Sequence, residues 1–336
     1  MDKDVIISVK DLEVSFYTNM RHNRVIRGIS FEIKKSRILC VVGESGCGKS
    51  VTANVIMGLL PELSRIEGGS VVYNKDGEEI HIEKLARKGK EMQALRGDEI
   101  AMIFQDPMTS LNPVFTIGYQ INENLLQHKY SKNKKEATER SIELLRDMGI
   151  SLPEQRVNEY PHQFSGGMRQ RAMIAMAMAC KPKLLIADEP TTALDVTIQA
   201  QIFDLMLKLK EENGTAIMLI THDMGVVAEL ADDVAVMYMG NIVESGTAEE
   251  VLGNPKHPYT KALMDSIPVL GLGKKQNLTP IRGSTPDPFN RPKGCQFCPR
   301  CDFATAKCEE EMPNEVLVEG SHKCRCFLYQ EQEGGK

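Results

Sequence analysis

The stretch GESGCGKS (43–50) decides the fold. It fits the pattern G-x-x-x-x-G-K-[S/T] and directly follows the apolar run RILCVV (37–42). A continuous apolar run of this length predicts a strand that is buried on both faces. We expect a helix from Lys49 to about Leu60, because Pro61 stops it. A strand, a glycine-rich loop and a helix in this order predict a phosphate-binding loop.

The chemistry of this loop follows from its residue types. Its glycines let consecutive backbone N–H groups point into one concavity, and the helix N-terminus adds a partial positive charge. Lys49 supplies a mobile charge for the β- and γ-phosphates of a nucleotide, and Ser50 offers a hydroxyl to Mg²⁺. The residues expected to contact ATP are Gly43, Glu44, Ser45, Gly46, Cys47, Gly48, Lys49, Ser50 and Val51.

Two adjacent acids follow another predicted strand in LLIADEP (184–190). At the C-terminal tip of a strand, Asp188 can hold a hydrated Mg²⁺ as a hard oxygen ligand. Glu189 points elsewhere and can polarise an attacking water. Two adjacent acids also occur in ordinary turns. The pair therefore indicates a nucleotide site only in combination with the glycine-rich loop upstream.

A second anion site is predicted at FSGGMRQR (164–171), where Ser165, Gly166 and Gly167 open a helix. Their hydroxyl and bare N–H groups lie at a positive helix end. Two such sites for one γ-phosphate favour a head-to-tail dimer, in which each loop faces the other chain's Ser-Gly-Gly. The alternative is an ordinary capped helix, with Ser165 as its N-cap.

Short apolar strands alternate with helices along most of the chain, which indicates a parallel sheet covered on both faces. We expect residues 1–250 to form one domain, with a helical subdomain inserted at about 107–178, because apolar residues recur there at helical spacing. Residues 251–336 form a Pro-rich C-terminal extension with a cysteine cluster.

Composition excludes several classes of protein. Of the 336 residues, 42% are hydrophobic and 26% are charged, which excludes wholesale disorder. The net charge of −5 argues against a protein that coats nucleic acid. The longest apolar run, 172–180, is about half as long as a bilayer span. The first ten residues do not form a signal peptide. We therefore expect a cytosolic protein, or one held at a membrane by a partner.

In these motifs and their order, the sequence resembles the nucleotide-binding subunits of ABC transporters. The likeness covers GESGCGKS, a Q-loop FQDP (104–107), the signature SGGMRQR, LLIADEP, a D-loop TALD (192–195) and a switch histidine in ITHD (220–223). It implies an α/β P-loop NTPase cassette: a parallel-sheet core plus an antiparallel β subdomain, an inserted helical subdomain and a small Cys-rich extension.

The same resemblance implies roles for single residues. Gln105 would contact Mg²⁺ and link to the helical subdomain, and His222 would sense the γ-phosphate. Phe16 would stack on adenine, with Tyr17 as the alternative, and Asp195 belongs to the D-loop. Glu189, His222, Lys49 and Gln105 are then the catalytic residues, and Ser50, Gln105 and Asp188 the Mg²⁺ ligands.

Four further segments narrow the resemblance to the oligopeptide and dipeptide importer ATPases: SLNP (110–113), YPHQFSGGMRQR (160–171), NPKHPYT (254–260) and GCQFCPRC (294–301). Met168 stands where Gln is commoner, and Ser36-Arg37 replaces the usual Gly-Glu. The resemblance implies two transmembrane permease subunits, a paralogous ATPase subunit or a second copy, an extracytoplasmic binding protein and a peripheral place on the cytoplasmic face of the membrane. Nickel uptake, a soluble ABC ATPase and a non-catalytic regulatory cassette are the alternatives.

Six of the nine cysteines gather in the tail, at positions 295, 298, 301, 308, 324 and 326. In a reducing cytosol such a cluster predicts a metal site before it predicts disulfides. The resemblance implies a [4Fe–4S] cluster on Cys295, Cys301, Cys308 and Cys326, with Zn²⁺ or free reduced thiols as alternatives. Because Cys298 adds a C-x₂-C-x₂-C spacing, the choice of four ligands stays open. The expected role is structural, since this segment is poor in apolar residues.

Overall fold

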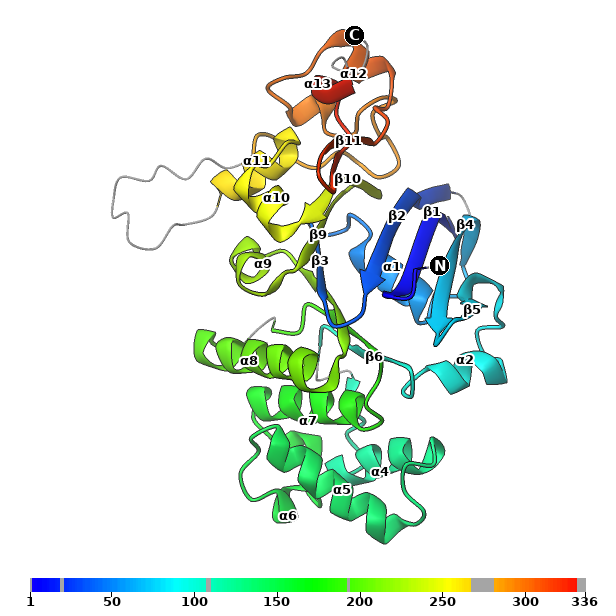
Figure 1. Ribbon diagram of the computed structural model, residues 1–336, viewed down its shortest axis with the longest axis vertical. Coiled ribbons are helices and arrows are strands. Elements are labelled where there is room, and N and C mark those ends of the chain that lie inside the picture. The colour runs from blue at the N-terminus through cyan, green and yellow to red at the C-terminus, as the bar shows by residue number, and fades with distance from the viewer. Residues whose placement is uncertain (1, 19–20, 107–109, 192–193, 267–280, 331–336) are drawn as a thin grey trace.

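The computed structural model describes residues 2–18, 21–106, 110–191, 194–266 and 281–330. Figure 1 shows an elongated molecule with its sheets in the middle, a group of helices at one end and the C-terminal segment at the other. Within the described residues, no helix is both long and apolar enough to cross a membrane.

An eight-stranded sheet forms the centre, in the order β11-β12-β10-β9-β3-β8-β7-β6. The five strands from β9 to β6 are parallel neighbours, and β10, β12 and β11 add antiparallel strands at one edge. The bounds are β3 Ile38–Val42, β6 Ile100–Ile103, β7 Leu184–Asp188, β8 Ala216–Thr221, β9 Asp233–Tyr238, β10 Asn241–Thr247, β11 Val316–Glu319 and β12 His322–Cys324.

A second, four-stranded antiparallel sheet has the order β2-β1-β4-β5. Its strands are β1 Val5–Thr18, β2 Arg21–Lys34, β4 Ser64–Lys75 and β5 Glu78–His81. The two apolar stretches VIISV and LEVSFY lie in the one strand β1, whose pairing shifts register between Val9 and Leu12. Asp11 has a positive φ of 47° at this irregularity, where the register shift marks a β-bulge.

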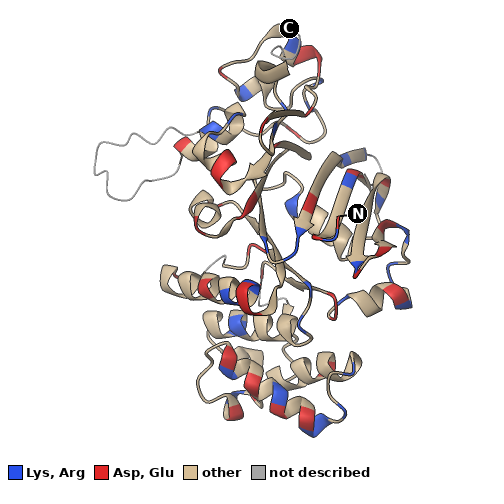
Figure 2. Cartoon of the chain, viewed as in Figure 1, with Lys and Arg blue, Asp and Glu red and all other residues tan. Residues whose placement is uncertain are grey.

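Between β6 and β7, the residues that the structure describes form four α-helices: α4 Ile117–Gln127, α5 Lys134–Asp147, α6 Pro153–Arg156 and α7 Gly166–Met178. The side chains of Thr116, Asn133 and Ser165 cap α4, α5 and α7. Positive and negative residues alternate along α5 in Figure 2, so that the surface of this helix does not carry charge of a single sign. The remaining helices are α1 Lys49–Ile56, α2 Lys90–Leu95, α8 Val196–Asn213, α9 Met224–Leu230, α10 Ala248–Gly253, α11 Pro258–Asp265, α12 Ala306–Glu310 and α13 Phe327–Gln330, with 3₁₀ turns η1 Ile82–Lys84, η2 Pro161–Gln163 and η4 Cys298–Arg300.

The helix after the glycine-rich loop ends earlier than the sequence predicts. It stops at Ile56 rather than near Leu60, because Gly58 takes a left-handed φ of 60°. The N–H of Leu59 then donates to the carbonyl of Asn54 and that of Gly58 to Val55, which closes the helix. Gly58, and not Pro61, therefore ends the helix.

Strand β3 lies at the centre of the core, and all five of its residues are buried. Ile38, Cys40 and Val42 pack into one hydrophobic cluster, together with α7 and α8. Leu39 and Val41 pack into the other, together with α1 and the antiparallel sheet. This alternation confirms that the run is buried on both faces.

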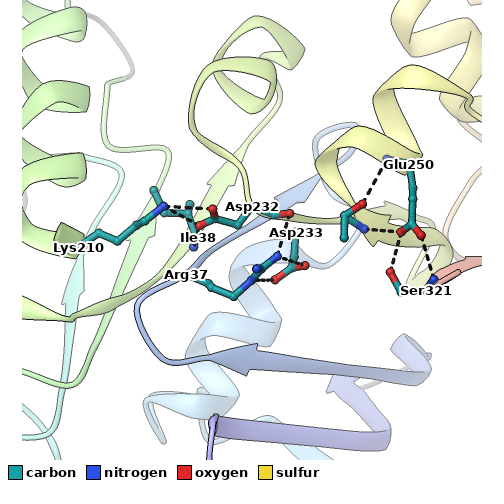
Figure 3. A network of polar contacts seen from close by, with 8 residues as sticks. Arg37, Ile38, Lys210, Asp232, Asp233, Glu250 and Ser321 are labelled. Atoms are coloured by element: carbon teal, nitrogen blue, oxygen red, sulfur yellow. Dashed lines mark hydrogen bonds and ion pairs between the residues drawn. The ribbon is translucent and has the colours of Figure 1, made fainter.

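The segment in front of β3 departs from the family pattern, and the structure gives both residues a place. Ser36 has a left-handed φ of 52°, a conformation in which glycine is the usual residue, and its hydroxyl donates to the carbonyl of Gly214. Arg37 makes two N–H bonds to the carboxylate of Asp233, of 2.7 and 2.8 Å. Figure 3 shows this pair beside Lys210, whose ammonium binds Asp232.

The C-terminal segment is part of the main sheet, because β12 pairs with β10 and β11 pairs with β12. Two carboxylates attach it. Glu250 accepts hydrogen bonds from the backbone N–H and the hydroxyl of Ser321 (Figure 3). Glu244, fully buried, lies 2.6 Å from His322 Nε2 and accepts the backbone N–H groups of Lys256 and His257. The segment 322–324 is thus held by buried polar contacts as well as by strand pairing.

Replacing Glu244 by Ala should lower the free energy of unfolding by about 3–5 kcal/mol, because it removes the partner of a buried histidine and of two backbone N–H groups. Urea unfolding followed by circular dichroism measures the loss. The control is Glu315→Ala, which removes a more exposed pair with Lys323 and should cost about 1 kcal/mol or less. Equal, small losses in the two variants would contradict the role given to Glu244.

Candidate nucleotide site

The loop 43–50 joins β3 to α1, and close packing restricts two of its glycines. A Cβ on Gly43 would lie 2.1 Å from the carbonyl oxygen of Met237 on β9. A Cβ on Gly48, which has a φ of 111°, would lie 2.5 Å from Ile26 on β2. The loop is therefore wedged between the two sheets, and side chains are excluded at both positions.

Helix α1 begins at Lys49 with Gly48 in front of it, so that no side chain caps its first turn. The Lys49 ammonium donates to the carbonyl oxygens of Gly43 at 2.6 Å and of Glu44 at 3.1 Å. Uncapped N–H groups and a buried lysine form a concentrated positive end, which suits an anion such as a phosphate. Burial raises the pKa of the neighbouring Cys47, which argues against an acidified thiol in the loop.

Ser50 and Asp188 meet where β7 ends beside α1. The Ser50 hydroxyl donates to Asp188 Oδ1 at 3.1 Å. Burial raises the pKa of Asp188 above the usual value of a carboxyl group. A cation nearby would offset the cost of keeping this carboxylate charged. A hydroxyl and a carboxylate are oxygen donors of the kind that Mg²⁺ prefers, so the two residues fit the predicted ion.

Glu189 brings together two residues that are far away in the sequence. Its carboxylate accepts a hydrogen bond of 3.0 Å from Gln105 Nε2 and lies 3.4 Å from His222 Nδ1. Its own backbone has a left-handed φ of 45°, and its N–H donates to the carbonyl of Ile220 on β8. Such a conformation is uncommon outside glycine, and the Glu189 carboxylate has other partners than that of Asp188, which accepts the Ser50 hydroxyl.

The serine-glycine-glycine segment lies at the N-terminus of α7. Ser165 caps this helix, since its hydroxyl accepts the N–H of Met168 at 3.3 Å, and both Ser165 and Gly166 are exposed. These residues line a hollow of about 490 Å³ together with Asp195, the N-cap of α8. In Figure 1, α7 belongs to the helical end of the molecule and α1 lies beside β2.

The other predicted site residues are placed as follows. Phe16 is half-buried and packs against the core cluster, whereas Tyr17 is exposed and its hydroxyl donates to Glu67. Ser45 and Gly46 are exposed at the tip of the loop, and Val51 lies in α1. Pro107 of the Q-loop, and residues 192 and 193 of the D-loop, lie outside the described residues. The adenine contact stays a prediction.

Sequence reasoning missed the contacts of the Glu44 side chain. It treats Glu44 as a loop position with a backbone role, but in the structure Arg300 and Thr285 bind its carboxylate. Only the arginine of the tail segment CPRC (298–301) could have signalled this, since charged residues are rarely buried unless they are paired.

A partly open cavity of about 140 Å³ lies in the C-terminal segment. Five of the six tail cysteines line it, and Cys324 instead lies buried on β12: the five are Cys295, Cys298, Cys301, Cys308 and Cys326. Burial raises the pKa of the Cys295 thiol to about 12 and that of Cys326 to about 11. Buried thiols without a metal are poor nucleophiles, so this pocket is not a reactive-thiol centre.

Across the described residues, no group of three or more His, Cys, Asp or Glu side chains is placed to hold a metal ion. Tetrahedral Zn²⁺ with bonds of about 2.3 Å would bring its sulfur ligands to about 3.8 Å from one another. The described residues show no metal site that would directly support either the iron–sulfur prediction or its zinc alternative.

A glycine-rich loop between a buried parallel strand and a helix, with acids at the end of a neighbouring strand, defines a P-loop nucleotide-binding protein. The chain belongs to the ABC transporter family of ATP-binding proteins. Residues 26–192 match the family described as ABC transporter, and residues 243–308 match the C-terminal region of oligopeptide/dipeptide transporters.

Relatives match over nearly the whole chain. The dipeptide transport ATP-binding protein DppD of Bacillus subtilis (strain 168) is 48% identical over 326 residues, 96% of this chain and 94% of the relative. The oligopeptide transport ATP-binding protein OppD of the same organism is 49% identical over 324 residues, 96% of this chain and 88% of the relative.

The fold also matches solved structures. The dimeric structure of MJ0796, a bacterial ABC transporter cassette, superposes with a TM-score of 0.63 at 27% identity, covering 72% of this chain and 98% of that one. A post-hydrolysis state of the same cassette, a dimer bound to ADP and Pi, matches equally well. These comparisons confirm the α/β P-loop cassette predicted from the sequence.

Proposed function

We propose that this chain is the ATP-hydrolysing subunit of an ABC importer that takes up di- or oligopeptides. One observation carries the proposal: Lys49, Ser50, Asp188 and Glu189 surround the end of β7 and the loop after β3, in a chain whose C-terminal segment is of the oligopeptide/dipeptide transporter type. The relatives named for dipeptide and oligopeptide transport support the substrate class.

The residues of the site divide the work of phosphoryl transfer. The loop N–H groups and Lys49 hold the β- and γ-phosphates, and Ser50, Asp188 and Gln105 would hold Mg²⁺. When bound, this ion neutralises charge that develops on the phosphate oxygens. Glu189 orients or deprotonates the attacking water, and His222 stabilises charge at the γ-phosphate. The protein acts by positioning and electrostatics rather than by covalent chemistry.

A second ATPase subunit completes the site in this proposal. In this proposal, the Ser165 hydroxyl and the N–H groups of Gly166 and Gly167 bind the γ-phosphate of the ATP that the other subunit of a head-to-tail pair holds. The dimeric cassette among the solved structures supports this arrangement. The second subunit is a paralogue in our proposal, with a second copy of this chain as the alternative.

We propose that two permease subunits attach the chain to the membrane. The chain would then lie peripherally at the cytoplasmic face of the membrane. The candidate contact is a hollow of about 410 Å³ where the helical group meets the sheet. Phe104, 40% exposed, lies there next to Gln105, together with Met176 and Gln120. A change in the contact between Gln105 and Glu189 that moves the helical group would therefore also move the surface that contacts the permease.

We also propose that Cys295, Cys301, Cys308 and Cys326 hold a [4Fe–4S] cluster. The support is that these four thiols line one cavity with apolar walls, which include Phe297 and Phe327. Thiolates are the usual ligands of such a cluster. Its contribution here is structural, since it would tie together the segments 295–308 and 326, which line the same cavity.

Glu189→Gln should bind ATP as the wild type does and lose about 10²-fold or more in the rate of hydrolysis, because general-base catalysis contributes that much. Phosphate release measures the rate, and light scattering measures the dimer that should accumulate with ATP. The control is Glu212→Gln, on the exposed face of α8. Hydrolysis at the wild-type rate in Glu189→Gln would show that Glu189 is not the base.

Purification of the tagged chain from detergent-solubilised membranes of its own organism should bring down two membrane-spanning proteins and a second ATPase subunit. Mass spectrometry identifies the proteins, and adding defined di- and oligopeptides with the binding protein should stimulate ATP hydrolysis. Co-purification with the membrane proteins but stimulation by nickel ions alone would assign another solute. Recovery with no membrane protein would favour a soluble ABC ATPase.

The protein prepared without oxygen should be brown, with broad absorbance near 400 nm, and should contain about four iron atoms per chain. Cys326→Ser should lose this absorbance, whereas Cys324→Ser, outside the cavity, should keep it. A colourless wild-type preparation that contains zinc by elemental analysis would replace the cluster by Zn²⁺. A preparation without either metal would leave five reduced thiols.

A further inference from the structure

The glycine-rich loop is held from outside by the C-terminal segment. Arg300 donates two parallel N–H bonds to the carboxylate of Glu44, of 2.8 and 2.9 Å, and the hydroxyl of Thr285 adds a third bond of 2.6 Å. The backbone N–H of Glu44 donates to the hydroxyl of Tyr259 at 2.9 Å. Three residues that lie more than 200 positions further along the chain thus bind one loop residue.

Arg300 is itself fixed by its surroundings. Its side chain is 5% exposed, Nε donates to the carbonyl of Arg282, and Nη1 also reaches the hydroxyl of Tyr238. The guanidinium lies 5.8 Å from the ring centres of Tyr238 and Phe297. Burial opposes the charge on Glu44, but the bonds from Arg300 and Thr285 outweigh it and lower the pKa of this carboxyl. The pair is therefore a charged, bidentate contact of the strong kind.

Arg300 is also connected to the cysteine cavity directly through the backbone. It ends the turn η4, between Cys298 and Cys301, which both line the cavity. The Arg300 N–H donates to the carbonyl of Phe297, and that of Cys301 to Cys298. A change in how these cysteines are held therefore changes where the guanidinium lies.

We propose that Arg300 is a positioning residue that holds Glu44, and with it the loop 43–50, ready for phosphate, and so makes ATP affinity depend on the cysteine cavity. Glu44 contacts Lys49 through its carbonyl, so that a displaced Glu44 would carry the lysine's acceptor with it. Without Arg300, the Glu44 carboxylate would keep the Thr285 hydroxyl but lose its cationic partner, and its negative charge would lie in the loop that binds the phosphates.

The first experiment measures the dissociation constant for ATP with Mg²⁺ by calorimetry, together with kcat and KM, in the full-length chain. Arg300→Gln should raise Kd and KM at least tenfold and leave kcat at saturating ATP within about twofold. Arg300→Lys should not restore affinity, since an ammonium cannot make the two parallel bonds. The matched control is Arg282→Gln, whose exposed side chain pairs with Asp302, and it should match the wild type.

A double-mutant cycle separates a direct contact from general damage. Glu44→Gln should raise Kd at least threefold, and adding Arg300→Gln to it should raise Kd far less than the product of the two single effects. Two independent effects, multiplying in the double variant, would overturn the proposal. So would an unchanged Kd in Glu44→Gln, a result that is available even where Arg300→Gln does not fold.

The link to the cavity is tested by Cys301→Ser, the cysteine next to Arg300. It should raise Kd for ATP in the wild-type background and cause no further rise in the Arg300→Gln background. An equal rise in both backgrounds would show that the cavity acts on the loop by another route and would overturn this half of the proposal.

The inference rests on the proposed function in one respect, that the loop 43–50 binds ATP, and the outcomes keep the two apart. Equal, negligible affinity in the wild type and in Lys49→Ala would defeat the proposed function itself. Tight binding in the wild type, lost in Lys49→Ala but kept in Arg300→Gln, would defeat only the role given to Arg300.

Discussion

The close approach of the loop after β3 to the strand beside it is the constraint on which the site depends. Gly43 leaves no room for a side chain against the Met237 carbonyl of β9, and the N–H of Gly240, in the turn that follows β9, donates to the carbonyl of Cys47. Because β3 is buried on both faces, its end cannot shift without disturbing both halves of the core. The loop therefore has one place in the fold, and the N–H groups that face a phosphate are oriented before any ligand arrives.

Parallel pairing then delivers the rest of the chemistry to the same edge. Strands β8, β7 and β6 follow β3 in this order across the sheet, and His222, Glu189 and Gln105 come soon after the ends of these strands. Since parallel strands present their carboxyl ends together, residues from four distant parts of the chain converge at one edge of the sheet. Glu189, whose backbone is left-handed, contacts Gln105 and His222, whereas Asp188 accepts the Ser50 hydroxyl, so that the two adjacent acids have different partners, as the proposed mechanism requires.

Sequence patterns predicted the structural features that depend on residues close together in the chain. The strand at 38–42, the loop and the start of α1 follow from apolar runs and glycines, and the cap at Ser165 follows from its residue type. The predicted end of α1 was wrong, because a lone glycine inside an apolar stretch ends the helix before the later proline does. The metal and adenine contacts stay predictions, since they concern atoms that the chain does not contain.

Long-range contacts could not be predicted. Strands β11 and β12 have four and three residues and pair only at the edge of the sheet, so that their sequences give too short a pattern to recognise. Glu44 and Arg300 are 256 positions apart in the sequence, and no sequence pattern near either residue indicates the other as its partner. Only the folded chain shows that the Cys-rich tail reaches the loop.

The pairing of β12 with β10 has a consequence for how the protein is made. A ribosome releases the chain from its N-terminus, so that β10 emerges about eighty residues before the strand that covers its edge. Until residues 322–324 arrive, that edge presents unpaired N–H and C=O groups to any other strand, an arrangement that favours aggregation. A prematurely terminated product would keep the edge open permanently, so quality control of nascent chains has a physical reason to act on truncated copies of this protein.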